Sequence, residues 1–278
     1  MDTQILYLDT NIFDHIQKGW IGEEVIKRLE EGISHGKSEI VLSYLNIEEA
    51  LSNFETDRNH GIEVLRHIFR LANTDKLIKQ DEDLIRDGIH AFLNNESDPS
   101  PFIPMDPIIK ENLSRLVTSS SSISEELEEV MRATKEQKEN FQEQMRQARI
   151  KMKPAVEALR GDHPSFYDYW NALCLNFAEG FAEKAGFLSE CKARGIELLL
   201  ENRTIRMAVG IALSFSYAQD LEGREPKISD SRDLKHAVLA ASASNCFITH
   251  DSKFARILKR VPIDNFQILR LDELTISL

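Results

Sequence analysis

Apolar residues near the start of the chain recur in the patterns of strands and amphipathic helices. Residues 4–8 form an apolar run of strand length, and helical spacing follows from residue 9 to about residue 18. Residues 23–34 repeat apolar positions every three or four residues, which predicts a second helix. The run at 40–42 predicts a buried strand, and a third helix begins near Asn46. The predicted order is strand, helix, helix, strand, helix.

The far end of the chain repeats this alternation. An alanine-rich helix is expected at residues 233–243, a strand at 246–249, a helix at 252–259 and a last strand at 266–271. Short apolar strands that alternate with amphipathic helices are typical of a parallel sheet covered by helices on both faces. The two ends together therefore predict an α/β fold.

The middle of the chain has helical patterning and almost no strand-like alternation. We therefore expect an α/β core of residues 1–56 and 228–278, with an all-helical insertion, residues 57–227, packed on it. A charged stretch, residues 125–153, is expected to be a projecting helix, an arm of a helical hairpin, an oligomerisation element or a solvated surface helix. The expected insertion helices lie at 62–72, 83–93, 166–181 and 204–217, with an irregular loop at 94–107 and a polar segment at 119–122.

Composition places the chain among soluble globular proteins. Hydrophobic residues make up 42% and charged residues 29% of its 278 residues, and no 18 apolar residues run together. Without a basic and apolar leader or a membrane span, we expect a cytoplasmic protein with no membrane partner. Cys174, Cys191 and Cys246 are odd in number and lack metal-ligand spacing, so we expect reduced thiols.

A formal net charge of −12 argues against nonspecific coating of nucleic acid, because affinity for phosphates comes mainly from lysine and arginine. A nucleic-acid enzyme of this charge needs a local basic patch. The candidate patch is Lys253, Arg256, Lys259 and Arg260, three or more of which share one helical face. The alternative for these residues is an ordinary solvated helix face.

Carboxylates follow the predicted strands. In open α/β sheets, sites form outside the carboxyl ends of the strands, so acids at these positions are expected to converge. Clustered carboxylates repel one another, and a hard divalent cation such as Mg²⁺ relieves that repulsion. Such an ion can polarise a phosphodiester and activate water, whereas the lack of a Cys/His ligand cluster disfavours zinc. The candidate acids are Asp9, Glu48, Glu49, Asp230, Asp233 and Asp251.

Helix capping is the competing explanation for each acid taken alone. Asp9, Asp230 and Asp251 precede predicted helices, where a carboxylate accepts hydrogen bonds from exposed amides. Asn46 followed by Glu49 resembles a capping box. The metal hypothesis depends on their joint placement at the strand ends.

Four segments that carry these acids resemble the four motifs of the PIN-domain family, in the family's order. The segments are YLDTN at 7–11, SYLNIEEAL at 43–51, DLKHAVLAA at 233–241 and FITHDSKF at 247–254, and the 18 residues from Asp233 to Asp251 fit the family spacing. The resemblance covers roughly the first 55 and last 50 residues, so the long middle has no counterpart. It implies a three-layer α/β/α fold with a short central parallel sheet, and an Mg²⁺- or Mn²⁺-dependent endoribonuclease that hydrolyses single-stranded RNA.

The resemblance also implies residue roles. Asp9, Glu49, Asp233 and Asp251 would bind the metal, with Asp230 as a fifth ligand or a helix cap. Glu49 lies six residues after Ser43, as in the family, and is favoured over Glu48. Asn11 and Thr249 would orient the acids. Apart from the resemblance, we expect Lys253 and Arg256 to seat the RNA backbone, and His236, one turn after Asp233, to pack between helices or to touch a phosphate. An antitoxin or other protein partner and a homodimer are further implications.

Two other functions compete with an active nuclease. A catalytically silent PIN-like scaffold or nucleic-acid-binding module would be expected to lack one or more acids, and here all four positions are filled. A phosphatase of the haloacid-dehalogenase type requires Asp-x-Asp after its first strand, where this chain has Asp9, Thr10 and Asn11. Glycine-rich phosphate-binding loops are also absent from the sequence.

Overall fold

The structure, a computed structural model, describes most of the chain. The described residues are 3–119, 147, 150, 154, 165–224, 229–263 and 265–274, with backbone alone at 53–56 and 119. The helix expected at residues 125–153 lies outside them, apart from Gln147 and Ile150.

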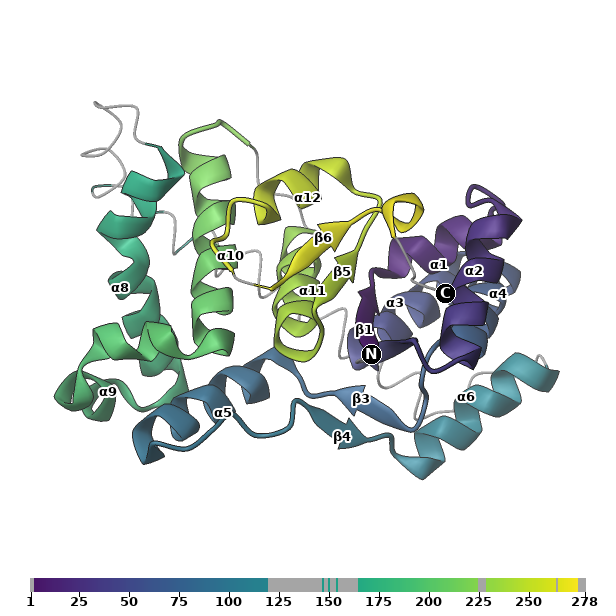
Figure 1. Cartoon of the computed structure of the whole chain (residues 1–278), viewed down its shortest axis with the longest axis horizontal. Helices are drawn as coiled ribbons and strands as arrows, with labels where there is room; N and C mark the ends of the chain where they lie inside the picture. Colours follow the sequence, from purple (N-terminus) through teal and green to yellow (C-terminus); the bar gives the residue numbers. More distant parts are fainter. Residues whose placement is uncertain are drawn as a thin grey trace.

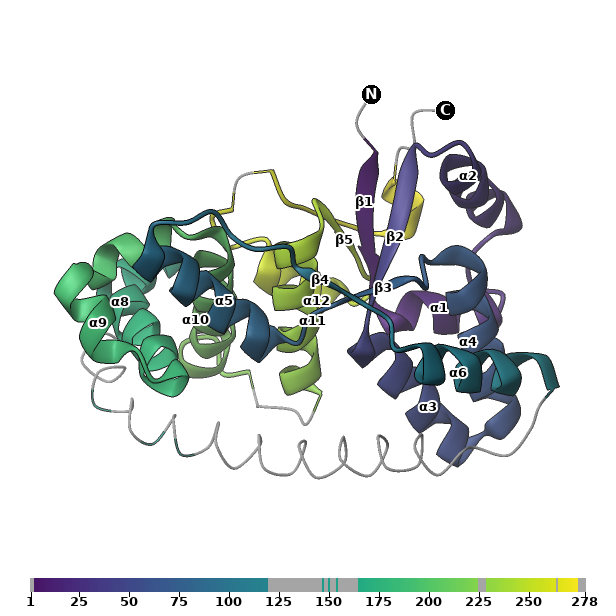
Figure 2. The same cartoon turned by 90° about the horizontal axis from the view of Figure 1, so that it is seen from below.

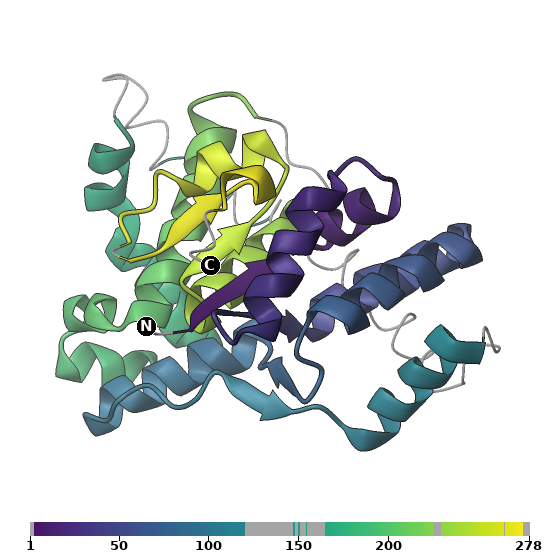
Figure 3. The same ribbon diagram turned by 45° about the vertical axis from the view of Figure 1, so that its right-hand side comes forward.

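Six strands form one sheet in the order β4-β3-β2-β1-β5-β6 (Figure 1). Neighbouring strands are parallel except β3 and β4, which are antiparallel. Figures 1 and 3 show that the first strand, in purple, lies next to strands from the far end of the chain, in yellow. The strands are β1 (Gln4–Leu8), β2 (Ser38–Ser43), β3 (Lys76–Ile78), β4 (Phe102–Pro104), β5 (Cys246–Ile248) and β6 (Gln267–Leu269).

Alternate residues of each strand face opposite sides of the sheet, and each side packs its own hydrophobic cluster. Tyr7 and Phe247 belong to one cluster, whereas Leu8 and Ile248 belong to the other. Helices cover both sides, as Figure 2 shows.

Two groups of helices, listed by their sides, complete the fold. On the side of Leu8 lie α1 (Thr10–Gln17), α2 (Glu23–Ser34), α3 (Tyr44–Thr56), α4 (Arg58–Leu71) and α6 (Pro107–Ser119). On the side of Tyr7 lie α5 (Asp81–Asn94), α8 (Phe166–Ala185), α9 (Leu188–Arg194), α10 (Arg203–Asp220), α11 (Asp230–Ala243) and α12 (Ser252–Leu258). Two short 3₁₀ helices, η1 (Ile196–Glu201) and η2 (Leu271–Glu273), complete the described elements.

The expectation of an all-helical middle is wrong. Residues 57–227 contribute both β3 and β4 to the same sheet as β1, with Leu77 opposite Ile103. Each of these strands has three residues, which is too short to show an alternating pattern in the sequence. Pro104 is tolerated because β4 is an edge strand, where a missing amide donor costs no ladder hydrogen bond.

The expected helices of the middle are present, and they pack on the rest of the fold. α10 contacts α8 of the middle as well as α11 and α12, so it joins the middle helices to the helices on either side of β5 in the chain. All three cysteines are free and buried. Within the described ranges, no helix combines the length and apolar character needed to cross a bilayer.

Candidate functional site

The strand order creates a crevice at one edge of the sheet. From β1 the chain proceeds to β2 and β3 on one side, whereas β5 and β6 lie on the other side of β1. Such a reversal leaves an opening outside the carboxyl ends of the two strands that flank it, here β1 and β5. Asp9 follows β1 directly, and Thr249 follows β5 directly.

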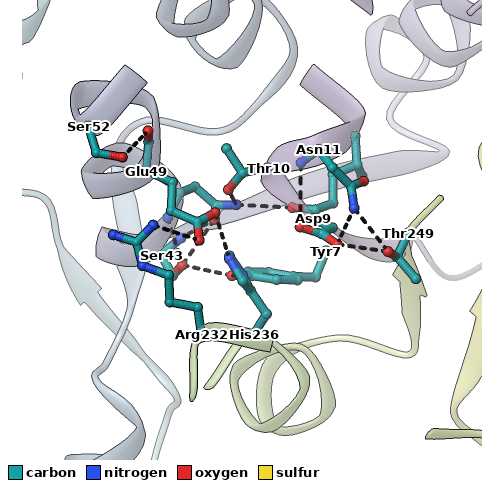
Figure 4. Close-up of polar contacts among 12 residues, drawn as sticks. Tyr7, Asp9, Thr10, Asn11, Ser43, Glu49, Ser52, Arg232, His236 and Thr249 are labelled. Carbon is teal, nitrogen blue, oxygen red and sulfur yellow. Dashed lines mark hydrogen bonds and ion pairs between the residues drawn. The ribbon is translucent and has the colours of Figure 1, made fainter. Parts of the chain in front are cut away.

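Asp9 is buried at this edge and held by three donors (Figure 4). Its Oδ2 accepts hydrogen bonds from Nδ2 of Asn11 at 2.6 Å and from Oγ1 of Thr249 at 2.7 Å. Its Oδ1 accepts a longer bond of 3.4 Å from the backbone N–H of Asn11, as the cap of α1. Asn11 and Thr249 therefore orient the Asp9 carboxylate, as the sequence motifs implied.

Thr249 links the acids from the two ends of the chain. Besides donating to Asp9, its Oγ1 accepts a 3.2 Å hydrogen bond from the backbone N–H of Asp251. The side chain of Asp251 is exposed, and its Oδ1 caps α12 by accepting from the amides of Lys253 and Phe254 at 2.8 and 2.9 Å. The carboxylate of Asp9 and the backbone N–H of Asp251 thus bind the same hydroxyl, that of Thr249. Both aspartates also cap helices.

Glu49 reaches the same edge from α3 and is fixed by His236 of α11. Nε2 of His236 donates to Oε2 of Glu49 at 3.0 Å, and Nη1 of Arg232 lies 3.5 Å from Oε1 of Glu49 (Figure 4). The other ring nitrogen of His236, Nδ1, lies 2.6 Å from the hydroxyl of Tyr7, which is itself 2.8 Å from Oγ of Ser43. A buried chain of hydrogen bonds therefore runs from Ser43 through Tyr7 and His236 to Glu49.

Asn46 positions the start of α3 against the strand ends. It is fully buried, and its Nδ2 donates to the carbonyl of Leu8 at 3.0 Å and to Oγ1 of Thr10 at 3.3 Å. Its Oδ1 accepts from the amide and the hydroxyl of Ser43 at 3.1 and 3.0 Å. The capping box expected from Asn46 and Glu49 is wrong, because α3 begins at Tyr44 and Asn46 ties its first turn to β1 and β2.

Three of these side chains form a cluster with metal-ligand spacing. One ligand atom each from Asp9, Glu49 and His236 can be chosen so that all lie within 4.8 Å of one another. They come from the end of β1, from α3 and from α11, so tertiary structure brings together residues separated by up to 227 positions in sequence.

Electrostatics distinguishes the two clustered acids. Burial raises the pKa of Asp9, and the nearby Glu49 charge adds to that effect. Burial also favours neutral Glu49, but the charge and hydrogen bond of His236 outweigh it and lower the pKa of Glu49 to about 2. Burial alone would lower the pKa of His236, whereas Glu49, Asp9 and Asp233 raise it above its ordinary value. Glu49 and His236 therefore form an ion pair. The carboxyl group of Asp9 beside them is harder to ionise.

Asp233 lies within electrostatic reach of this cluster. Its pKa is raised to about 7, first by burial and then by the Asp9 charge, with smaller contributions from Asp230 and Asp251. A carboxyl group whose pKa is raised by burial together with neighbouring negative charge is frequent at functional sites. Glu49 therefore acts on Asp9, and Asp9 acts on Asp233, at this edge of the sheet.

Asp230 is held apart from the cluster. Both of its carboxylate oxygens accept hydrogen bonds from Arg224, at 2.9 and 2.6 Å, and its side chain is buried. A bidentate arginine pair neutralises a carboxylate and fixes its direction. Asp230 is the first residue of α11 and does not act as its N-cap, which is Ser229. We assign Asp230 to this ion pair.

Sequence patterns alone gave an incomplete set of site residues. The sequence leaves His236 either as a packing residue or as a phosphate contact, although its position one helical turn after Asp233 places it on the same helix face as that acid. The sequence does not indicate the contacts of Tyr7, Asn46 and Arg232, because their partners lie on other elements.

The basic patch is divided by the structure. The side chains of Lys253, Arg256 and Lys259 are exposed on or just after α12, immediately beyond Asp251. Arg260 instead pairs with Glu222 and lies over the ring of Tyr217. The part of the patch open to a ligand is therefore the first three residues.

Comparisons with known proteins identify no relative of this chain. No protein-family model matches it, and no curated protein or solved structure matches it.

Proposed function

We propose that this protein is a metal-dependent endoribonuclease of the PIN-domain kind, which hydrolyses phosphodiester bonds of single-stranded RNA. The observation that carries the proposal is the cluster of Asp9, Glu49 and His236 at the carboxyl edge of the sheet, with ligand atoms within 4.8 Å. The charges of Asp9 and Asp251 both raise the pKa of Asp233, and four segments that resemble the PIN-family motifs contain these residues.

The chemistry of the donor set fits a divalent cation. Carboxylate oxygens are the preferred ligands of Mg²⁺ and Mn²⁺. Burial and then the Asp9 charge raise the pKa of Asp233 to about 7, and a cation would relieve the repulsion between the two acids. His236 belongs to the same cluster, but its Nε2 donates to Glu49 and its Nδ1 contacts the hydroxyl of Tyr7. The ion would therefore be held by carboxylate oxygens, which Mg²⁺ and Mn²⁺ both accept.

Asp9 and Glu49 would hold the ion, and Asp233 and Asp251 would supply further carboxylates. When bound, the ion would polarise the phosphodiester and lower the pKa of an attacking water. Thr249 and Asn11 fix the direction of the Asp9 carboxylate through bonds of 2.7 and 2.6 Å. Side chains held in this way are already oriented before the substrate arrives, which lowers the cost of reorganisation.

His236 and Tyr7 position Glu49. Because Tyr7 contacts Nδ1 of His236 at 2.6 Å, the ring can turn its Nε2 only toward Glu49. The contact with His236 thereby fixes the carboxylate of Glu49 relative to that of Asp9. Lys253 and Arg256, exposed beyond Asp251, provide cations that can contact the RNA backbone.

The second candidate is a silent PIN-like scaffold or nucleic-acid-binding module. The observation that favours it is that Asp9 and Asp251 both cap helices, so each has a structural role without catalysis. The two proposals differ in whether bound metal leads to cleavage.

The decisive variant is Asp9→Asn. Asparagine also caps helices well, so α1 should be retained while the anionic ligand is lost. With Mn²⁺ and a labelled single-stranded RNA, we expect the rate of cleavage to fall by about a hundredfold or more. Asp251→Asn should also lower the rate, whereas Asp83→Asn, on the exposed first turn of α5, is the matched control.

Metal binding is measured separately by thermal unfolding. Mn²⁺ at about a hundred times its Kd should stabilise the wild-type protein by about 2.7 kcal/mol, and Asp9→Asn should lose most of that gain. Undiminished cleavage by both site variants would contradict the nuclease proposal. Stabilisation by Mn²⁺ without RNA cleavage would support the scaffold.

A further inference from the structure

A small cavity adjoins the acidic cluster on the side of β2 and β3. Its volume is about 50 Å³, and it opens between the first turn of α3, the β3–α5 junction and α11. Ser43 lines the cavity and also forms a hydrogen bond with the hydroxyl of Tyr7. The same hydroxyl contacts Nδ1 of His236. Ser43 and Tyr7 therefore connect the cavity to the cluster of Asp9, Glu49 and His236.

One edge of the cavity carries a negative and a positive group side by side. Oδ1 of Asp81 lies 3.7 Å from Nζ of Lys235, and the two side chains are 17% and 30% exposed. This separation exceeds hydrogen-bond distance, so each group can still form a hydrogen bond with a third molecule. Leu239 and Ile78, which are buried, form an apolar part of the lining.

We propose that this cavity binds a cytosine base of the RNA strand, next to the phosphodiester bond that is cut. The proposal rests on the proposed function and names a base preference for it. The N4 amino group of cytosine would donate to Asp81, and its N3 and O2 atoms would accept from Lys235. Uracil presents the acceptor O4 where cytosine presents its amino donor, so the Asp81 carboxylate repels it.

The size of the cavity supports a single-ring base. The volume of the cavity is only about 50 Å³, so it suits a small, flat group better than a large one. Adenine has the same donor and acceptor side by side, but its second ring requires more space.

The electrostatics of Asp81 agrees with a ligand that donates hydrogen bonds. Burial raises the pKa of Asp81 and the charge of Lys235 opposes that rise without cancelling it. A carboxylate in this position is incompletely solvated in the free protein. An amino donor from a base would supply hydrogen bonds that water supplies elsewhere.

The test measures binding of cytidine and uridine by ligand-observed NMR, with EDTA present. These nucleosides carry no phosphate, so the measurement does not depend on metal or on cleavage. We expect cytidine to bind at least fivefold more tightly than uridine, the lower end of the range for base-edge discrimination. Asp81→Asn should bring that ratio close to one, because the amide of asparagine can donate to O4 of uridine.

Two further variants make the test specific. Lys235→Met should weaken cytidine binding without affecting the first turn of α5, so it tests the cavity even if the Asp81 variant unfolds. Asp83→Asn, in the same helical turn but exposed, should leave the ratio unchanged. Equal binding of the two nucleosides, or no binding of either, would overturn the inference.

The result separates this inference from the proposed function. Cytidine selectivity in a protein that cleaves no RNA would retain the base site and reject the nuclease. RNA cleavage without cytidine selectivity would retain the nuclease and reject the base site.

Discussion

Single side chains at this site have two tasks. Asp9 accepts a hydrogen bond from a helix amide and also belongs to the cluster with Glu49 and His236, so capping a helix does not exclude the proposed ligand role. Burial and the neighbouring Asp9 charge raise the pKa of Asp233 to about 7, against an ordinary value of 3.8. A carboxyl group that is harder to ionise in the folded protein destabilises the fold wherever the unfolded chain has already lost the proton.

The predicted consequence is a stabilising substitution. Between about pH 4 and pH 7 the folded protein binds more protons at Asp233 than the unfolded chain, so stability falls as pH rises through this window. In EDTA at pH 8, Asp233→Asn should raise the free energy of unfolding by on the order of 1 to 3 kcal/mol, and by less at pH 4.5. Urea unfolding at both pH values measures this.

Mn²⁺ provides the control for that prediction. Bound cation should remove the repulsion in the wild-type protein, so the advantage of Asp233→Asn should shrink or reverse in saturating Mn²⁺. A variant that is less stable than wild type in EDTA at pH 8 would contradict the electrostatic account.

Helix α10 illustrates how an element is fixed by one residue. Gly210 faces Val261, and a Cβ at this position would lie 2.2 Å from Cγ1 of Val261 and 3.3 Å from the ring of Trp170. Only a residue without a side chain allows this approach. The contact holds α10 against the segment after α12.

We therefore predict opposite effects of the same substitution in two helices. Gly210→Ala should destabilise the protein by about 1–3 kcal/mol, because the methyl group overpacks the contact. Gly180→Ala, in α8, has no atom within 4 Å of its new Cβ and should be neutral or stabilise by up to about 1 kcal/mol. Thermal unfolding of both variants decides between packing and helix propensity, and equal effects would refute the packing argument.

At the scale of the whole molecule, charge limits how RNA can bind. With a formal net charge of −12, most of the surface repels phosphates, and attraction must come from local groups such as Lys253 and Arg256. Binding should therefore involve few phosphate contacts. We expect a plot of log affinity against log salt with a slope of magnitude below about 3 for a single-stranded RNA.

The double substitution of Lys253 and Arg256 to glutamine tests this local attraction. It should weaken RNA binding in fluorescence polarisation and reduce the slope by about 1 to 1.5, because each lost phosphate contact in single strands contributes about 0.7. The matched control replaces Lys192 and Arg194, on α9 at the far end of the molecule in Figure 1, with glutamine. If the control weakens binding as much, the basic residues of α12 have no special role.

The sequence by itself determined the features that depend on neighbouring residues. The apolar run of β1 and the periodicity of α2 predicted elements with the observed bounds, Gln4–Leu8 and Glu23–Ser34. Because strand ends follow from apolar runs, the positions of Asp9 and Asp251 at one edge of a parallel sheet were also predictable.

Tertiary structure decided what depends on distant partners. β3 and β4 are too short to produce a pattern and exist through pairing with each other and with β2. The role of His236 comes from Glu49, 187 positions away, and from Tyr7, 229 positions away. Local sequence sets the direction of a side chain along its own element, whereas its hydrogen-bond partners and burial are set only when the elements pack.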